Sequence, residues 1–504
     1  MRHTDDHPAA RPRGPGADDA REERVLDALP VAAVLGLGRS GLGAARLLRV
    51  QGWAVRALDL APRPAALERW EALRDEQCAL VTGPHAPGAL AGCRLLVRSP
   101  GIPADAPILR AARQQGVPIV AEIELAAAAA RGPIVAVTGT NGKSTTTAWT
   151  AHLLQRAGRA AIACGNIGHA LSEAVVAEPE GTIFVTEVSS FQLEECPRFH
   201  PQAAVILNIT PDHLDRHGTL AAYAAAKWSI AREMTPADRL LLGPGVEPPA
   251  VEGAVMDRPA RPDEPDGSDR PDGPDKPAAP RAMAAMTRIA AADPGGEEAL
   301  FVDRGRLIWR RGRERQEILA AHELALPGPH NQINALAAFG LAVTQVAAVA
   351  ALRAGLRDFP GLAHRLERVA EANGVLWVND SKATNVESLR VALQSYRRPI
   401  VLIAGGRDKA GDFEALGAQV ARRLRHLITI GEASARLRSA WPAVSAEHAE
   451  DLGTAVARAA ACAQPGDVVL LSPGCASFDM YADFAARGDH FRQLVRARLS
   501  EEGT

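Results

Sequence analysis

The sequence predicts an α/β protein built from three domains. At 504 residues the chain is too long for one hydrophobic core, and roughly 150 residues per domain suggests about three units. Apolar runs rich in β-branched residues alternate with glycine turns and helix-compatible segments three times along the chain, which is typical of parallel sheets covered by helices. A net charge of -2 gives no basic field for nucleic acid or anionic lipid, so we expect small-molecule partners and no nucleic acid.

The first domain, expected over 25–121, begins with a Rossmann-like pattern. The segment "VAAVLGLGRSGLGAARLL" from Val31 combines an apolar run, a G-x-G-x-x-G turn at 36–41 and a helix-compatible stretch. Asp59 ends the next apolar run, near the distance expected for a ribose-binding acid. The turn fits NAD, and a uridine nucleotide on the same fold would use the same turn. It therefore predicts a nucleotide and leaves the reaction open.

The central domain, expected over 122–361, carries a second glycine loop of the P-loop ATPase type. The usual pattern G-x-x-x-x-G-K-[ST] requires a glycine at position 137, where this chain has valine. Backbone N–H groups, a helix N-terminus and an ammonium would still converge on phosphate, while a hydroxyl reaches Mg²⁺. A turn that merely needs glycine is the alternative. The candidate nucleotide-binding residues are Gly139, Thr140, Asn141, Gly142, Lys143, Ser144 and Thr145.

Two further strand-like runs of this domain end in possible metal ligands. Glu187 follows "TIFVT", and Asp212, His213, Asp215 and His217 follow "AAVILNIT". The two histidines are four residues apart, which would suit zinc, but no H-E-x-x-H motif or third imidazole lies nearby in the sequence. Neighbouring oxygen ligands beside a phosphate loop favour Mg²⁺ over zinc. Buried, hydrogen-bonded polar residues are the alternative interpretation.

The third domain, expected over 362–504, is again Rossmann-like. Its strand-like runs "GVLWVNDSKATN", "PIVLIAGGRDKAGDF", "LRHLITIGEA" and "GDVVLLSPGCASFD" each end in small and polar residues. Polar groups should therefore gather at the carboxyl ends of the strands, where ligands bind in such sheets. Cys475 invites interpretation as a nucleophile, but no histidine partner is signalled, so we expect it to serve packing.

The cysteine content and two segments of biased composition predict the cellular compartment and the segments without a packed core. Six cysteines without a C-x-x-C pair predict neither a disulfide framework nor a thiolate zinc site, which fits a reducing cytoplasm. Residues 1–24 contain charge, proline and glycine without an apolar core, so we expect a disordered tail and no membrane insertion. Residues 244–294 are rich in proline, aspartate and glycine. We interpret them as a tolerated loop insertion; a regulatory or partner-binding tail is the alternative.

Several motifs together resemble the Mur ligases of peptidoglycan synthesis. The motifs match the family in their order and spacing. They are "GTNGKST", "GNIG", "EVSSFQLE", "DHLDRHG", "HNQINALAA", "HRLE", "NDSKATN", "GGRDK" and "LSPGCASFD". The shortened glycine loop is the form that this family uses. The pair "NDSKATN" and "LSPGCASFD" is similar to the branch that adds D-glutamate to UDP-N-acetylmuramoyl-L-alanine. The resemblance implies an ATP-dependent amide ligase that forms an acyl phosphate, and we expect a monomer.

The resemblance also implies roles for the residues that match its motifs. Lys143 would grip the β- and γ-phosphates of ATP, Ser144 and Glu187 would hold one Mg²⁺, and His213 a second. Lys227 is by itself a lone lysine on an alanine-rich helix, whose default state is a solvated side chain. The resemblance instead implies a carbamylated lysine near the metal ions.

Further positions match the substrate sites of the family. The adenosine part of ATP or its phosphates would contact Asn331, Arg365 and Asp380. The uridine diphosphate would contact Leu37, Arg39, Ser40, Asp59, Ser99 and Gly101, and the muramoyl ligand Asn166. Glutamate would contact Lys382, Thr384, Lys409, Ser477 and Phe484.

Three other functions fit parts of the sequence. A related ligase could add a different amino acid, or add glutamate to folate, although the G-x-G-x-x-G domain argues against the folate enzyme. An NAD-dependent oxidoreductase would explain the segment 36–41 and leave the glycine loop at 139–145 unexplained. A scaffold that binds nucleotide without turnover would be favoured if Glu187, His213 or Lys227 were missing, and all three are present.

Overall fold

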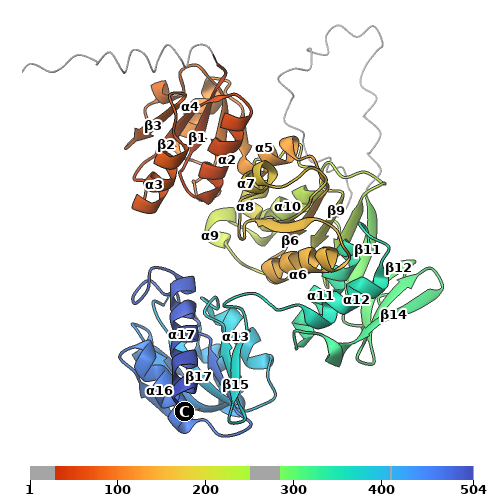
Figure 1. The fold of residues 1–504 in the computed structure, drawn as a ribbon, viewed down its shortest axis with the longest axis vertical. Coiled ribbons are helices and arrows are strands. Elements are labelled where there is room, and N and C mark those ends of the chain that lie inside the picture. The colour runs from red at the N-terminus through yellow and green to blue at the C-terminus, as the bar shows by residue number, and fades with distance from the viewer. Residues whose placement is uncertain (1–28, 250–283, 409–410, 503–504) are drawn as a thin grey trace, which may run out of the picture. The chain divides into compact units, whose positions relative to one another are not determined.

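Parallel sheets covered by helices form most of the structure, a computed structural model that describes residues 29–249, 284–408 and 411–502 (Figure 1). Three sheets contain parallel strands, which confirms the predicted α/β class. The chain divides into two units. Of the described residues, the first unit holds those up to Ile289 together with Ala337–Ala348, and the second holds Ala290–Leu336 together with those from Val349 onward.

The first sheet has the strand order of a Rossmann fold without its sixth strand. All its strands are parallel; in spatial order they are β3 (Cys78–Thr82), β2 (Ala54–Asp59), β1 (Val31–Leu35), β4 (Cys93–Arg98) and β5 (Ile119–Ala121). Its helical elements are α2 (Arg39–Val50), α3 (Pro64–Leu73), η1 (Pro87–Leu90) and α4 (Pro107–Gln114). The start of α2 requires glycine at position 41, because a Cβ on Gly41 would lie 1.8 Å from the carbonyl oxygen of Gly36, in the turn after β1.

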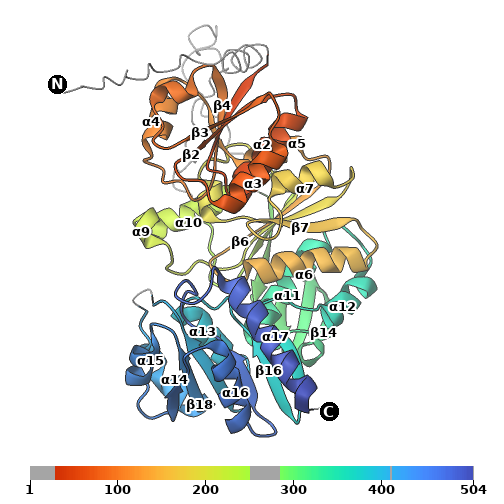
Figure 2. The same ribbon diagram turned by 60° about the vertical axis from the view of Figure 1, so that its left-hand side comes forward.

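The second sheet of the first unit carries the phosphate loop. Its parallel strands are, in spatial order, β11 (Ala285–Ala290), β10 (Arg239–Leu242), β9 (Ala203–Ile206), β6 (Ile134–Thr138), β8 (Ile183–Glu187) and β7 (Ala161–Gly165). The helices are α5 (Glu122–Ala129), α6 (Lys143–Arg156), α7 (Leu171–Ala177), α8 (Ser190–Leu193), α9 (Leu214–His217), α10 (Leu220–Trp228) and η2 (Ser229–Ala231). Helix α6 packs on β6, β7 and β8, directly after the loop that follows β6 (Figure 2).

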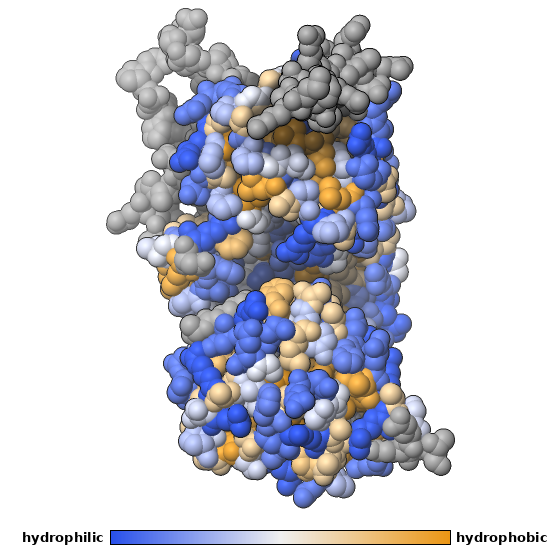
Figure 3. Space-filling model, turned by 90° about the vertical axis from the view of Figure 1, so that its left-hand side faces the viewer, coloured by the Kyte–Doolittle hydropathy of each residue, from blue (hydrophilic) through white to orange (hydrophobic). Residues whose placement is uncertain are grey.

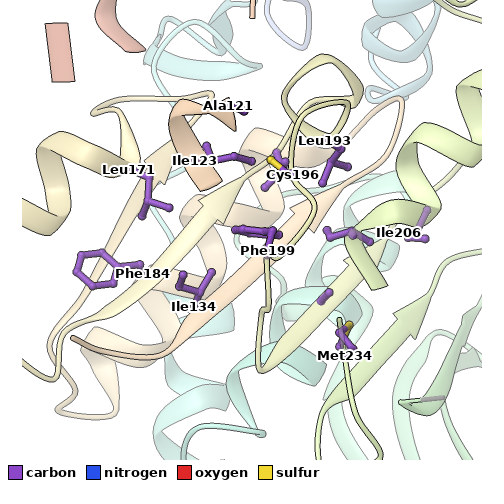
Figure 4. Packing of buried hydrophobic residues seen from close by; sticks show 14 of the residues in the cluster. Ala121, Ile123, Ile134, Leu171, Phe184, Leu193, Cys196, Phe199, Ile206 and Met234 are labelled. Atoms are coloured by element: carbon purple, nitrogen blue, oxygen red, sulfur yellow. The ribbon is translucent and has the colours of Figure 1, made fainter. Parts of the chain in front are cut away.

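A large apolar cluster fixes this sheet against its helices (Figure 4). It joins Phe184 of β8 and Ile206 of β9 to Leu171 of α7 and Leu193 of α8, all buried. Burial of such side chains stabilises the sheet by about 1.5 to 3 kcal/mol each. The carboxyl ends of β6, β7, β8 and β9 are therefore held rigidly next to one another, and the candidate catalytic residues follow these ends.

The second unit begins with an antiparallel arrangement of β12 (Glu298–Asp303), β13 (Arg306–Arg311) and β14 (Glu314–Ala320). The short helix η4 (Ala321–Glu323) follows, and then α11 (Pro329–Ala342) and α12 (Val349–Asp358). The residues of α11 from Ala337 onward belong to the first unit. The apolar spacing predicts a packed helix around Ile333, Leu336 and Leu341. Helix α11 covers these positions, and Leu336 and Leu341 are fully buried.

The third sheet also belongs to the second unit. Strand β15 (Glu367–Ala372) is antiparallel to β16 (Val375–Asn379); the parallel strands after β16 are β20 (Val468–Leu471), β17 (Ile400–Gly405), β18 (Leu424–Ile430) and β19 (Ala446–His448). Helices α13 (Val386–Gln394), α14 (Gly417–Arg423) and α15 (Ser434–Ala440), with η5 (Glu414–Leu416), pack into one apolar cluster. Helices α16 (Leu452–Cys462) and α17 (Phe484–Glu502) pack into another on the opposite face of the sheet.

Some sequence predictions concern segments outside these elements. The expected tail at 1–24 lies outside the described residues, as do residues 250–283 of the expected insert. Strand β11 occupies the C-terminal part of that insert range. Within the described residues, every helix is too short or too polar to cross a membrane. Hydrophilic residues cover much of the face drawn in Figure 3, with smaller hydrophobic groups between them.

Candidate active site

The phosphate loop connects the buried strand β6 to helix α6, as the sequence predicts. Gly139 and Gly142 have φ angles of +146° and +84°, which side-chain-bearing residues rarely adopt. A Cβ on Gly139 would also lie 3.0 Å from the Cβ of Leu207. The 14-residue helix α6 begins at Lys143 and buries Ser144 and Thr145. The loop thus places an ammonium and a hydroxyl at a helix N-terminus, an arrangement suited to phosphate.

Asn208, which the sequence analysis does not single out, holds this loop in shape. Its Oδ1 accepts hydrogen bonds from the N–H groups of Thr140 and Asn141, at 3.1 and 2.8 Å. Its Nδ2 donates to the carbonyl oxygen of Asn141 at 3.1 Å. Asn208 follows strand β9, so the rule that polar residues after parallel strands form the site could have identified it.

Lys227 lies beneath the loop. Its side chain is 1% exposed, and its Nζ donates to the carbonyl oxygen of Gly139 at 2.9 Å and lies 4.3 Å from the centre of the Tyr223 ring. Burial, together with the positive charge of Lys143, lowers the pKa of Lys227 to about 7 against the opposing charges of Asp212 and Glu187. A large fraction of this amine is therefore neutral at physiological pH.

Glu187 and Asn166 meet because Glu187 is the last residue of β8 and Asn166 directly follows β7, the neighbouring parallel strand. The Nδ2 of Asn166 donates to Oε1 of Glu187 at 2.8 Å, and its backbone N–H donates to the Glu187 carbonyl oxygen at 2.9 Å. Oε2 of Glu187 is buried and has no hydrogen-bond partner among the described residues. A buried carboxylate oxygen without a partner is unusual and suits a cation.

His213 stands at the N-cap of the short helix α9, with a left-handed φ of 52°. Its ring packs edge-on against Phe191, with 4.9 Å between ring centres, and it lies 3.6 Å from the carboxylate of Asp212. The imidazole is half exposed, so it remains accessible to a ligand. His217 instead contacts the hydroxyl of Ser190 at 3.0 Å.

The donor set fits Mg²⁺ better than zinc. In the part of the chain that the structure describes, no three His, Cys, Asp or Glu side chains gather as a metal cluster. Zinc sites need three or four protein ligands, whereas Mg²⁺ keeps several waters and takes one or two carboxylates plus substrate phosphate. Ser144, Glu187 and His213 are the described candidates for holding it.

In the first domain, Asp59 braces two turns. Its Oδ2 accepts from the N–H of Leu37 at 2.7 Å and its Oδ1 accepts from the N–H of Ala61 at 3.0 Å. The Leu37 side chain is buried in the core, so this residue can offer a ligand only its backbone. Ser99 donates from Oγ to the carbonyl oxygen of Gly36 at 3.1 Å, which fixes the loop before Gly101 against the glycine turn.

Two arginines connect the first domain to the central domain. The Nη1 of Arg39 donates to the carbonyl oxygen of Gly168 at 2.7 Å, next to the Asn166 loop. Arg216, which the sequence analysis does not single out, donates to the carbonyl oxygen of Pro100 at 2.9 Å and pairs with Glu194 at 2.7 Å. No sequence pattern marks Arg216 for this role, because its partners are distant in sequence.

The candidate residues of the third domain gather at the carboxyl ends of its strands. Asp380 follows β16 and is buried; it accepts from the N–H of Leu366 at 3.1 Å and from the hydroxyl of Ser472 at 2.9 Å. Burial raises the pKa of Asp380 to about 7. The Lys382 ammonium lies 5.4 Å from the centre of the Phe484 ring, which brings two expected glutamate contacts together.

The other expected contacts in the second unit are placed less completely. Ser477 is buried, and Thr384 is partly buried. Asn331 lies in the first turn of α11 and donates from Nδ2 to the carbonyl oxygen of Pro327 at 2.8 Å. Arg365 follows His364 at the entry to the third domain. Lys409 lies outside the described residues.

Three family models match this chain. They describe a Mur ligase MurD-like N-terminal domain at residues 31–121, a Mur ligase middle domain at 137–243 and a Mur ligase glutamate ligase domain at 364–475. The chain belongs to the Mur ligase family. The three-domain organisation of the Mur ligases therefore agrees with the three α/β repeats expected from the sequence.

Individual Mur ligases match over almost their entire length. A UDP-N-acetylmuramoylalanine–D-glutamate ligase of Symbiobacterium thermophilum is 39% identical over 92% of this chain and 98% of the relative. Enzymes of the same name from Koribacter versatilis and Anaeromyxobacter dehalogenans are 37% and 42% identical, over 96% and 92% of this chain and 99% and 96% of the relatives. These matches place the chain on the MurD branch of the Mur ligases.

Solved Mur ligase structures share the fold at lower identity. UDP-N-acetylmuramate–alanine ligase MurC from Thermotoga maritima has a TM-score of 0.55 at 18% identity, covering 93% of this chain and all of the other. MurF from Acinetobacter baumannii has a TM-score of 0.53 at 18% identity, covering 88% and 90%. At such identities the likeness concerns the fold alone.

Proposed function

We propose that this chain is an ATP-dependent ligase that joins D-glutamate to UDP-N-acetylmuramoyl-L-alanine in peptidoglycan synthesis. The observation that carries the proposal is the match to ligases named for this reaction, at 37% to 42% identity over at least 92% of the chain. The strand–glycine loop–helix around Lys143 supports the nucleotide half of the reaction.

The proposed reaction has two steps. A carboxylate oxygen of the alanyl group attacks the γ-phosphorus of ATP, the bond to ADP breaks, and an acyl phosphate forms. The amine of D-glutamate then attacks the acyl carbon, inorganic phosphate leaves, and the new amide nitrogen loses a proton. Such transfers depend mainly on positioning and on neutralising phosphate charge.

Residues around the phosphate loop would catalyse the first step, the transfer of the γ-phosphoryl group. The Lys143 ammonium, at the start of α6, would bind the β- and γ-phosphates and stabilise the charge that builds up on them. Ser144, Glu187 and His213 would hold Mg²⁺, which when bound screens the phosphate oxygens. The partnerless Oε2 of Glu187 supports this role.

Lys227 would act as a carbamate. Its neutral amine would attack CO₂, forming a nitrogen–carbon bond and releasing a proton, which turns the neutral amine into an anionic carbamate. The buried position beneath Gly139 and the pKa of about 7 both support this reaction at Lys227, since only the unprotonated amine is nucleophilic.

The remaining candidate residues would bind the substrates. Asn166 would contact the muramoyl ligand, and uridine diphosphate would contact the turns around Leu37, Arg39, Ser40, Asp59, Ser99 and Gly101. The adenosine part of ATP or its phosphates would contact Asn331, Arg365 and Asp380. D-glutamate would contact Lys382, Thr384, Lys409, Ser477 and Phe484; ammonium groups and hydroxyls complement its two carboxylates.

We place the reaction in the cytoplasm and expect the enzyme to act as a monomer. All six cysteines are free thiols, which supports a reducing compartment. Sedimentation at several protein concentrations tests the monomer: a mass that rises with concentration would contradict it.

The proposed function is tested by a phosphate-release assay with four components. Purified protein should release phosphate only when ATP, Mg²⁺, UDP-N-acetylmuramoyl-L-alanine and D-glutamate are all present. Each component is omitted in turn, and L-glutamate, L-lysine and meso-diaminopimelate replace D-glutamate in parallel. Equal or faster turnover with L-glutamate would refute the stereochemical part, and faster turnover with another amino acid would refute the substrate.

A further inference from the structure

Arg487 is among the largest fully buried side chains of the protein, at 1% exposure. It lies in the first turn of α17. Its Nε donates to Oγ of Ser381 at 3.0 Å and its Nη2 donates to the Ser381 carbonyl oxygen at 2.9 Å. Nη2 and Nη1 donate to the carbonyl oxygens of Cys475 and Ala476, at 3.2 and 3.4 Å. One guanidinium thus joins two loops to a helix.

The groups that accept these bonds are neighbours of the proposed glutamate contacts. Ser381 precedes Lys382, and Ala476 precedes Ser477. The hydroxyl of Ser381 also donates to the carbonyl oxygen of Phe484 at 2.8 Å. Arg487 therefore fixes the backbone directly beside three of the residues proposed to bind the amino acid.

A third loop meets the same guanidinium. A Cβ on Gly406 would lie 3.1 Å from Nη1 of Arg487. Gly406 belongs to the "GGRDK" segment, whose Arg407 exchanges two backbone hydrogen bonds with Ala476, at 2.9 and 3.0 Å. The loops after β16, β17 and β20 thus converge on this one side chain.

The electrostatic setting of Arg487 is unusual for a buried cation. Among the described residues no carboxylate forms an ion pair with it, and its hydrogen-bond acceptors are a hydroxyl and carbonyl oxygens. Burial lowers the pKa of Arg487 to about 10, so it stays charged at neutral pH. The carboxylate of Asp479 opposes this lowering through its charge. Without a hydrogen-bonded carboxylate the buried charge still costs free energy, and an anionic substrate nearby would offset part of that cost.

We infer that Arg487 is a positioning residue for the amino-acid substrate: it locks the three loops that present the glutamate contacts and adds a fixed positive charge behind them. This inference rests on the proposed function, because the amino acid is identified there as a dicarboxylate. Arg487 is not proposed to touch the substrate; it acts through Lys382, Ser477 and Phe484.

The test compares Arg487→Met and Arg487→Lys with the wild type in the phosphate-release assay. The KM for D-glutamate should rise about tenfold or more in Arg487→Met, as expected for the loss of charged, buried hydrogen bonds. The KM values for ATP and for the UDP-linked substrate should change less than about twofold. Arg487→Lys keeps the charge and should recover part of the D-glutamate KM.

Arg425→Met is the matched control in the same domain. Arg425 pairs with Asp467 through bonds of 2.6 and 3.0 Å near the amino ends of β18 and β20, at the end of these strands opposite to the candidate contacts. It should leave the KM for D-glutamate unchanged. Thermal unfolding of every variant is measured alongside, so that a loss of stability is seen separately from a change in KM.

Three outcomes would overturn the inference. The first is a folded Arg487→Met variant with the wild-type KM for D-glutamate, and the second is an equal rise in all three KM values. If Arg487→Met fails to fold, Ser381→Ala is tested in its place. This variant removes one hydrogen-bond acceptor of Arg487 and the link to Phe484, and it should raise the KM for D-glutamate about threefold. The third outcome that would overturn the inference is an unchanged KM for D-glutamate in Ser381→Ala. If the wild-type protein releases no phosphate in response to D-glutamate, the proposed function is refuted, and this inference with it.

Discussion

Lys143 and Lys227 donate hydrogen bonds from their Nζ atoms to the same acceptor, the carbonyl oxygen of Gly139, at 3.0 and 2.9 Å. Two ammonium groups held at one oxygen disfavour each other's charge, and the more deeply buried Lys227 is the one whose pKa falls to about 7. The geometry therefore gives the two lysines different surroundings: Lys143 lies at the start of α6, whereas Lys227 is buried beneath the loop.

Lys227→Ala should lose most of the activity, and added formate or acetate should restore part of it, because a small carboxylate can replace the carbamate. Activity of the variant is measured against carboxylate concentration, with Lys227→Arg as a control that fills the space and should gain nothing. Labelled ¹³CO₂ should give a carbamate NMR signal in the wild type that Lys227→Ala lacks. Failure of rescue together with absence of that signal would contradict carbamylation.

Lys143→Ala should reduce turnover by about a thousandfold or more, because charge on the transferred phosphoryl group would lose its main cation. The side chain sits at the N-terminus of α6, where its Nζ also bonds to the carbonyl oxygen of Thr140 at 2.8 Å. Turnover is measured at saturating substrates. His152→Ala, on the same helix, serves as a control and should keep activity within about threefold; near-normal activity of Lys143→Ala would remove the central argument for the loop.

Glu187→Gln should raise the Mg²⁺ concentration needed for half-maximal rate by about tenfold or more, because a neutral amide is a poorer ligand for a hard cation. The amide can still accept the bond from Asn166 at Oε1, so the fold should be retained. The rate is measured across a Mg²⁺ titration, with thermal unfolding as the check on folding. A Mg²⁺ dependence identical to the wild type would show that Glu187 does not hold the metal.

Local patterns predicted the backbone of the site well. The change from strand to glycine loop to helix around Lys143 lies within one short segment, so its conformation follows from the sequence. The meeting of Asn166 and Glu187 follows from a simple topological rule, since both residues lie at the carboxyl ends of parallel strands that are neighbours in the sheet.

Burial of charged residues could not be predicted in the same way. The buried Arg487 and Lys227 and the partly buried Arg216 look like solvated side chains in the sequence, because arginine and lysine are rarely buried. Their positions depend on hydrogen bonds to residues 11 to 116 positions away, such as Ser381 for Arg487. The resemblance marked Lys227 as functional, but its depth beneath Gly139 emerges only from the packed structure.

Glu122 is another buried ionisable residue, and the alanine-rich sequence "EIELAAAAA" around it does not predict its burial. The carboxyl is 1% exposed and accepts from the N–H of Ser172 at 2.7 Å. Burial raises the pKa of Glu122 from 4.5 to about 7. In the unfolded chain the group loses its proton near pH 4.5, whereas the folded protein keeps it up to about pH 7. Stability should therefore fall as pH rises through this interval, by about 3 kcal/mol in full.

Glu122→Gln removes the ionisation while keeping an acceptor for Ser172. The Tm of the variant relative to the wild type should therefore rise between pH 5 and pH 8, because only the wild type must bury a carboxylate at the higher pH. Ile123→Val, in the same buried helix, removes one methylene group and should lower Tm by a similar amount at every pH. Tm is measured by calorimetry at intervals across this range. A difference between Glu122→Gln and wild type that stays constant with pH would mean that Glu122 does not keep its proton in the folded protein.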